Sequence, residues 1–221
     1  MDQCGRYPVE VMDNPAAPSP GQAPQHYFSS EPLTAKNLRD LHVNIAGQDL
    51  ELVTASGIFS PDHIDLGTKV LLRKAPTPPA AGNLLDIGCG WGPIALPLAL
   101  RSPAAHVWAV DVNSRALELV RRNAERAGVK NLTAVPPGEV PADLKFAAIW
   151  SNPPVRIGKP ALQELVSTWL QRLIADGDAW LVIQRNLGGD SLHRWLMEQG
   201  WAVERAGSAK GFRVLRVTRE N

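Results

Sequence analysis

The sequence predicts an α/β domain in which a mostly parallel sheet is covered by helices on both faces. From residue 82 onward, short apolar runs alternate with segments of helical periodicity, a pattern typical of strands and helices in a parallel sheet. The last two apolar runs lie too close together for a helix between them, so the final strand is expected to be antiparallel. An alternating stretch ahead of this pattern predicts an N-terminal β-hairpin extension.

The 221 residues divide into a tail, an extension and a core. With 44% hydrophobic and 20% charged residues, the composition is that of a globular domain with a sizeable core. Residues 1–26 are rich in proline and poor in branched apolar side chains, so we expect a flexible tail there. Residues 27–80 are expected to form a hairpin and helix, and 81–221 the ligand-binding core. Residues 27–221 should fold as one structural domain.

Local signals predict the individual elements in order. Apolar and polar residues alternate over 41–59 with a turn at Gly47-Gln48, which indicates the hairpin, and a helix over 62–74 follows. Further strands are expected at residues 83–87, 106–111, 131–135, 146–151, 179–184, 201–205 and 212–217. Further helices are expected at residues 92–101, 114–127, 160–175 and 189–199.

Charge, cysteine content and hydropathy exclude several classes of protein. The net charge is +1, so no overall basic field indicates a nucleic-acid-binding protein, although a local patch remains possible. The two cysteines, Cys4 and Cys89, are far apart, which gives neither a disulfide framework nor metal-ligand spacing. No apolar segment is long enough to span a bilayer, and the N-terminus has no secretory signal pattern. We therefore expect a cytoplasmic protein with no metal and no membrane contact.

A glycine-rich turn at residues 84–92 joins the first core strand to the first core helix. Its alternate glycines allow a tight turn and close approach of a ligand, but the third glycine comes one residue too early for a dinucleotide fingerprint. Asp86, just before the turn, would repel a phosphate and attract an ammonium group. Asp111, at the end of the next strand, is placed to accept both hydroxyls of a ribose. An amine-bearing nucleoside without phosphates fits both acids, and S-adenosylmethionine is such a ligand.

A second turn, Ser151 to Pro154, ends the apolar strand at 146–151. Neither proline can donate a hydrogen bond to a sheet, and Asn152 is restricted to extended geometry by the proline after it. The result is a rigid turn rich in acceptors at the carboxyl end of a strand, where α/β sheets bind ligands. Such a turn can hold a planar amino group that is to be alkylated.

Together these motifs resemble the class I, Rossmann-like S-adenosylmethionine-dependent methyltransferases that modify planar amines. More narrowly, the chain is similar to the "methyltransferase small" group, which includes small-subunit ribosomal RNA guanine-N2 methyltransferases, and to its short, single-domain branch. The resemblance rests on separate motifs in the family's order, namely residues 57–60, 65–68, 86–90 with Asp111, 152–159, 182–184 and 210–215.

The resemblance implies a role for each matching residue. Asn152, Pro153, Pro154 and Val155 would form the catalytic turn, with the Asn152 side chain and the Pro153 carbonyl accepting the amine. S-adenosylmethionine, which becomes S-adenosylhomocysteine, would be bound by Asp86 through its ammonium, by Asp111 through its ribose and by Thr68 through its carboxylate. The remaining implied contacts are Ile87, Gly88, Cys89 and Gly90 in the turn, Val112 and Pro137 around the adenine, Glu139 at its amino group, and Asn152.

The sequence departs from the family pattern at three positions. Val155 stands where the family often has an aromatic residue that stacks on the target base. Ala147 stands where an aspartate is common, and Glu139 is the one acid near the third core strand that can face the adenine. Without the aromatic residue, the identity of the target rests on the resemblance.

The expected substrate is guanine N2 in ribosomal RNA, either naked or in a small-subunit particle. Adenine N6, a protein glutamine amide, and a non-catalytic S-adenosylmethionine- or RNA-binding module remain as alternatives. An RNA-facing patch at the mouth of the site would include Arg156, Lys159, Lys210 and Arg213, and an ordinary solvated surface is the equally weighted alternative. The sequence leaves the oligomeric state open.

Overall fold

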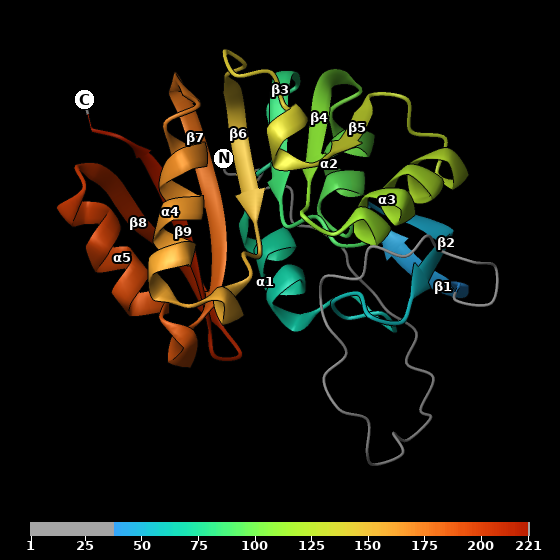
Figure 1. Ribbon diagram of the computed structural model, residues 1–221, viewed down its shortest axis with the longest axis horizontal. Helices are drawn as coiled ribbons and strands as arrows, with labels where there is room; N and C mark the ends of the chain where they lie inside the picture. Colours follow the sequence, from blue (N-terminus) through green and yellow to red (C-terminus); the bar gives the residue numbers. More distant parts are fainter. Residues whose placement is uncertain (1–37, 221) are drawn as a thin grey trace, which may run out of the picture.

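A seven-stranded sheet runs through the computed structural model, which describes residues 38–220 (Figure 1). The strand order is β5-β4-β3-β6-β7-β9-β8, in which neighbours from β5 to β7 are parallel and β9 is antiparallel to both of its neighbours. The strands are β3 (Ala81–Ile87), β4 (Ala104–Val110), β5 (Leu132–Val135), β6 (Phe146–Ser151), β7 (Leu173–Gln184), β8 (Trp201–Ala209) and β9 (Phe212–Arg219). The expected α/β class and the antiparallel last strand are confirmed. The expected tail at 1–26 lies outside the described residues.

The N-terminal hairpin forms a separate two-stranded sheet of β1 (Leu38–Ile45) and β2 (Gln48–Ala55). Its turn is Ala46-Gly47, one residue earlier than predicted, because Ile45 and Gln48 already pair across the hairpin. Both turn residues have positive φ, 55° and 82°, as a tight two-residue hairpin turn requires.

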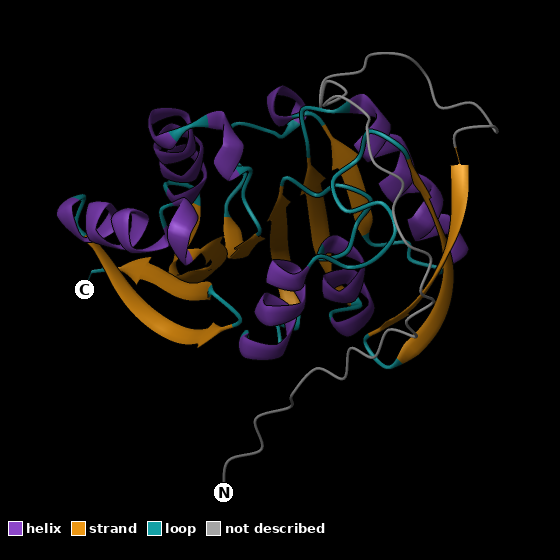
Figure 2. Cartoon of the chain, turned by 90° about the horizontal axis from the view of Figure 1, so that it is seen from below, coloured by secondary structure: helices purple, strands orange, loops and turns teal. Residues whose placement is uncertain are grey.

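The helices are segregated onto the two faces of the large sheet (Figure 2). One face is covered by α1 (Leu66–Lys74), α2 (Ala95–Arg101), α3 (Ser114–Arg126) and the hairpin, and the other by α4 (Lys159–Leu170) and α5 (Gly189–Glu198). Successive strand residues point to opposite faces, so Leu84 belongs to the first core and Leu85 to the second. Within residues 38–220, no helix is long and apolar enough to cross a membrane.

Three predicted helices are shorter than expected by three residues or more, namely α1, α2, which begins at Ala95 instead of residue 92, and α4. Helix α1 begins at Leu66 because Asp65 caps it, its side chain accepting from the backbone N–H groups of Gly67 and Thr68. Helix α4 ends at Leu170, five residues early, because Leu173 is buried and pairs with Phe146 at the start of β7. The hydrophobic pattern alone does not separate a helix end from a following buried strand.

Candidate active site

The glycine turn and the Asn-Pro-Pro turn meet at the carboxyl ends of β3, β4 and β6. The hydroxyl of Ser151 donates to the carbonyl of Ile87 at 2.7 Å, which ties the end of β6 to the end of β3. The N–H of Gly88 donates to the carbonyl of Val110 at 2.8 Å, which ties the turn to β4. A Cβ on Gly88 would lie 3.6 Å from Cδ of Pro154. The two turns that the sequence singled out are therefore neighbours.

Asp86 is fully buried beneath the glycine turn. Its Oδ2 accepts from the N–H of Ala95 at 2.9 Å, whereas its buried Oδ1 has no hydrogen-bond partner in the described part of the chain. Burial raises the pKa of Asp86 well above its ordinary value, the Ala95 N–H lowers it, and the charge of Asp111 raises it further. A buried carboxylate oxygen without a donor is a costly feature that an ammonium group would satisfy. This geometry fits the amino end of S-adenosylmethionine.

Asp111 organises the glycine turn from the end of β4. Its Oδ2 accepts from the N–H of Gly90 at 3.1 Å, and its Oδ1 accepts from the N–H of Asn113 at 2.9 Å. Burial raises the pKa of Asp111, and these backbone N–H groups lower it. Each carboxylate oxygen retains a further acceptor site, so Asp111 can hold the turn and still accept ribose hydroxyls.

The glycine turn itself adopts backbone conformations that side chains disfavour. Gly88, Gly90 and Gly92 have φ of 73°, 54° and 100°. A Cβ on Gly90 would meet nothing within 4 Å, so the space above this residue is open to a ligand. Burial is also the main cause that raises the pKa of the Cys89 thiol, so Cys89 acts as a small packing residue.

Asn152 is held in one orientation by two residues at the start of α1. Its Nδ2 donates to Asp65 Oδ2 at 2.9 Å and to Thr68 Oγ1 at 3.1 Å. Both amide hydrogens are then used, and the reversed amide would place its oxygen against the Asp65 carboxylate. The Oδ1 atom of Asn152 is therefore the end that remains to accept a hydrogen bond from a ligand.

The predicted adenine contacts lie at the ends of adjacent strands. Val112, which follows β4, is 67% exposed, so its side chain is accessible to a ligand at this end of the strand. Pro137 and Glu139 follow β5 in a short 3-10 turn, and Glu139 is exposed. These three residues stand on the side of the glycine turn away from Asn152, because β3 lies between β4 and β6.

The predicted RNA-facing cations differ in how freely they can bind. Arg156, Lys159 and Lys210 are exposed, the first two beside the Asn-Pro-Pro turn and the third in the loop between β8 and β9. Arg213 instead donates to Asp190 at 3.2 Å and to Ser208 at 2.9 Å. An arginine engaged in this way supports the fold of α5 against β9, and it would have to exchange partners to bind a phosphate.

Two polar residues that support the site, Asp65 and Asn123, were given no role from the sequence, although Asp65 lies within the 65–68 motif. Asp65 contacts Asn152 although 87 positions separate them, and the Asp-Leu-Gly-Thr run is a recognisable helix cap. Asn123 is fully buried and bonds to both the N–H and the carbonyl of Val53, and to the carbonyl of Trp91. No local pattern marks a polar residue on a helix as a bridge of this kind.

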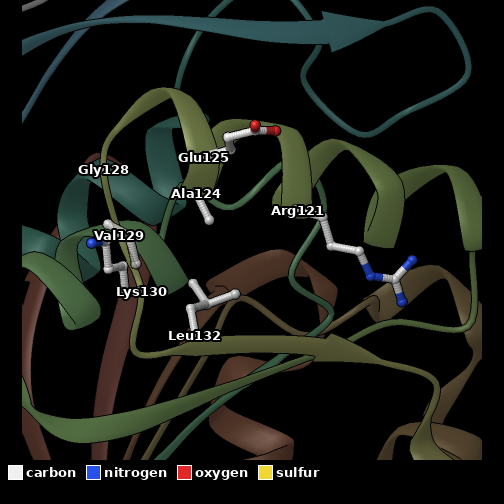
Figure 3. Close-up of a pocket in the computed structure, with 7 residues that line it drawn as sticks. All are labelled: Arg121, Ala124, Glu125, Gly128, Val129, Lys130 and Leu132. Atoms are coloured by element: carbon white, nitrogen blue, oxygen red, sulfur yellow. The ribbon is translucent and has the colours of Figure 1, made fainter.

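The pocket drawn in Figure 3 lies away from this site. It is formed by the last turns of α3 and the start of β5, where the Arg121 side chain donates to the carbonyl of Ala134. Its lining consists of Arg121, Ala124, Glu125, Gly128, Val129, Lys130 and Leu132. It shares no residue with the two turns, and it carries none of the groups that fit S-adenosylmethionine.

The sheet order, the glycine turn, the buried acid and the Asn-Pro-Pro turn define an S-adenosylmethionine-dependent methyltransferase with a Rossmann-like fold. A family model described as "Methyltransferase small domain" matches residues 49–216. The chain belongs to the methyltransferase small domain family, and S-adenosylmethionine is its cofactor. The resemblance predicted from the motifs is thereby confirmed.

Relatives and solved structures agree with this assignment. Uncharacterized protein YbxB of Bacillus subtilis is 32% identical over 195 residues, which cover 87% of this chain and 97% of YbxB. Ribosomal RNA small subunit methyltransferase C of Stutzerimonas stutzeri is 30% identical, over 84% of this chain and 55% of that protein. The 16S rRNA N2 G1207 methyltransferase (RsmC) of T. thermophilus, solved with AdoMet and guanosine, is 22% identical with a TM-score of 0.71, covering 86% of this chain and 53% of that one. The chain thus spans about half the length of these two RsmC proteins and nearly all of YbxB.

Proposed function

We propose that the protein N-methylates an exocyclic amine, most specifically guanine N2 of ribosomal RNA, and so acts in rRNA processing. One observation carries the proposal. The amide hydrogens of Asn152 are both bound within the protein, which leaves Oδ1 as a fixed acceptor in the turn beside the glycine loop. An acceptor held in this way suits a donor with N–H groups, such as an amine conjugated to a ring.

The residues of the glycine turn would hold the cofactor. Asp86 would bind the ammonium through its unpartnered Oδ1, and Asp111 would bind the ribose. The Thr68 hydroxyl accepts from Asn152 and still has its own hydrogen to donate to the cofactor carboxylate. Val112 and Pro137 would flank the adenine, with Glu139 at its amino group. When bound, S-adenosylmethionine supplies an electrophilic methyl group on a sulfonium.

The Asn-Pro-Pro turn would orient the amine. Asn152 Oδ1 and the backbone carbonyl of Pro153 would each accept one N–H, which directs the nitrogen lone pair away from the turn and toward the glycine loop. This arrangement lowers the barrier by positioning, and it requires no strong base before transfer. Val155 offers no aromatic face, so the target base has to be held by other contacts.

An RNA substrate is supported by the relatives' names and by the exposed cations. The similar proteins named above as methyltransferase C or RsmC act on small-subunit or 16S ribosomal RNA according to their descriptions. Arg156, Lys159 and Lys210 would contact phosphates around the site. Because a base edge inside a helix is inaccessible, the target nucleotide has to be unpaired or flipped, at a cost of a few kcal/mol.

Transfer of a labelled methyl group tests the proposal. In separate reactions, the protein and methyl-labelled S-adenosylmethionine are incubated with unmodified small-subunit rRNA transcript, small-subunit particles, total protein or DNA. Digestion of the labelled RNA to nucleosides should yield N2-methylguanosine. Label in N6-methyladenosine or in glutamine would contradict the substrate, and binding of cofactor without label in any fraction would contradict catalysis.

A further inference from the structure

We infer that Asp65 is a positioning residue that orients Asn152 and strengthens its Oδ1 as the acceptor for the substrate amine. The inference rests on the proposed function of the Asn152 turn and adds a residue to it. Asp65 lies before α1, outside both of the turns that carry the chemistry. It would act through Asn152 and would touch neither the substrate nor the cofactor.

A single oxygen of Asp65 accepts three hydrogen bonds and joins the start of α1 to the end of β6. Asp65 Oδ2 accepts from the N–H of Gly67 at 2.8 Å, from the N–H of Thr68 at 3.3 Å and from Nδ2 of Asn152 at 2.9 Å. The first two bonds cap α1, and the third reaches the end of β6. The same atom therefore fixes the start of the helix and the orientation of the amide.

The packing around Gly67 keeps this oxygen in place. A Cβ at Gly67 would lie 2.9 Å from Asp65 Oδ2 and 2.7 Å from Cε1 of Phe212, so both groups occupy space that only a glycine leaves open. Phe212 is the first residue of β9, and its ring lies next to Gly67 at the start of α1. The absence of a side chain at Gly67 therefore leaves room at the helix start for both the Asp65 carboxylate and the Phe212 ring.

The charged Asp65 carboxylate polarises the Asn152 amide more strongly than a neutral acceptor would. A hydrogen bond to a carboxylate is stronger than one to a neutral oxygen, and it polarises the group that donates it. When an amide N–H donates to a carboxylate, electron density shifts from the N–H bond onto the nitrogen, and resonance places part of it on the oxygen, so these bonds increase the partial negative charge on Oδ1. The Asp65 carboxylate therefore makes Asn152 a better acceptor for the substrate N–H at the opposite end of the amide.

Asp65→Asn separates this role from the capping role. Asparagine caps helices about as well as aspartate, so α1 should remain intact while the charge is lost. Asp62→Asn is the matched control, because this substitution removes the same charge three residues earlier in the chain. Asp62 pairs with the exposed Arg39 at 2.9 Å. The Asp62 variant should behave as wild type in every assay below.

The kinetic experiment measures kcat for methyl transfer and the Kd for S-adenosylmethionine. For Asp65→Asn we expect kcat to fall about tenfold or more while the Kd changes less than about threefold. In an Asn152→Ala background, where the amide is already gone, Asp65→Asn should cause no further loss, measured in single-turnover assays. A kcat within twofold of an active wild type, or an equal additional loss in the Asn152→Ala background, would overturn the inference.

A measurement without turnover distinguishes this inference from the proposed function. In the wild-type protein without ligand, NMR of selectively ¹⁵N-labelled asparagine should show the two Asn152 side-chain protons exchanging slowly and shifted downfield. The exposed Asn186 supplies the reference for a free amide. Asp65→Asn should accelerate exchange at Asn152. If the Asn152 protons exchange as fast as those of Asn186, the contact is absent and the inference is wrong, whether or not the protein methylates any substrate.

Discussion

Replacing Asp86 by asparagine should lower the affinity for S-adenosylmethionine without lowering the stability of the protein. The substitution keeps the size of the side chain and an acceptor for the N–H of Ala95, which now bonds to Oδ2 at 2.9 Å. It removes the charge from the buried Oδ1, the atom assigned to the cofactor ammonium. A hydrogen bond to a charged group contributes about 1.5–3 kcal/mol, so the affinity for S-adenosylmethionine should fall about 10- to 150-fold.

Without cofactor, Asp86→Asn should stabilise the protein, although it weakens binding of the cofactor. Burial raises the pKa of Asp86 above its value in the unfolded chain, with Asp111 adding to the effect, so the folded state holds the proton more tightly. As pH rises from the unfolded to the folded pKa, the wild type therefore loses stability that the neutral asparagine does not lose. At pH 8 the variant should be the more stable protein, and the difference should vanish at low pH.

Calorimetry and thermal unfolding check both parts of this prediction. Methylthioadenosine, which has the adenosine but no amino acid portion, is the control ligand, and its affinity should be unchanged in Asp86→Asn. An equal loss of affinity for both ligands would refute the assignment of Asp86 to the ammonium. A variant that is less stable than wild type at every pH would refute the account of an unpaired buried charge.

Two further predictions concern the support of the site and its RNA contacts. Asn123→Ala should lower the free energy of unfolding in denaturant by about 3 kcal/mol or more, because the N–H and carbonyl of Val53 and the carbonyl of Trp91 would lose buried partners worth about 1 kcal/mol or more each. A loss below about 1 kcal/mol would contradict this. Lys210→Gln should weaken RNA binding and reduce the slope of log affinity against log salt by about 1. Lys130→Gln, in the pocket remote from the site, is its control, and equal slopes for both variants would exclude Lys210 from the interface.

Short-range signals were sufficient to predict the architecture and the two turns. Asp86 and the glycines after it are recognisable because a strand, a tight turn and a helix follow one another in the chain. Asn152 is recognisable because two prolines must end the strand that precedes it. Both turns follow parallel strands, so both lie at the carboxyl edge of the sheet. They are close together because β3 and β6 are neighbours in the strand order.

Contacts between distant segments could not be predicted in the same way. Asp65 and Asn152 are 87 residues apart, and Asn123 and Val53 are 70 apart. The first pair depends on how α1 packs against the sheet, and the second on how the hairpin packs against α3. Composition and periodicity do not specify this packing. The early end of α4 was missed for a related reason, since Leu173 is apolar in either state and only its pairing with Phe146 selects the strand.

The most direct test of the central claim is methyl transfer to unmodified small-subunit rRNA by the wild type and by Asn152→Ala, with the S-adenosylmethionine Kd measured for both. Asn44→Ala is the matched control, because it removes the same amide from the hairpin, where Asn44 bonds to Asp49. We expect N2-methylguanosine with the wild type and with the control, and a rate of transfer lower by far more than tenfold with Asn152→Ala, at nearly constant Kd. A loss of less than about tenfold, equivalent to about 1.4 kcal/mol of barrier, would contradict the role assigned to Asn152.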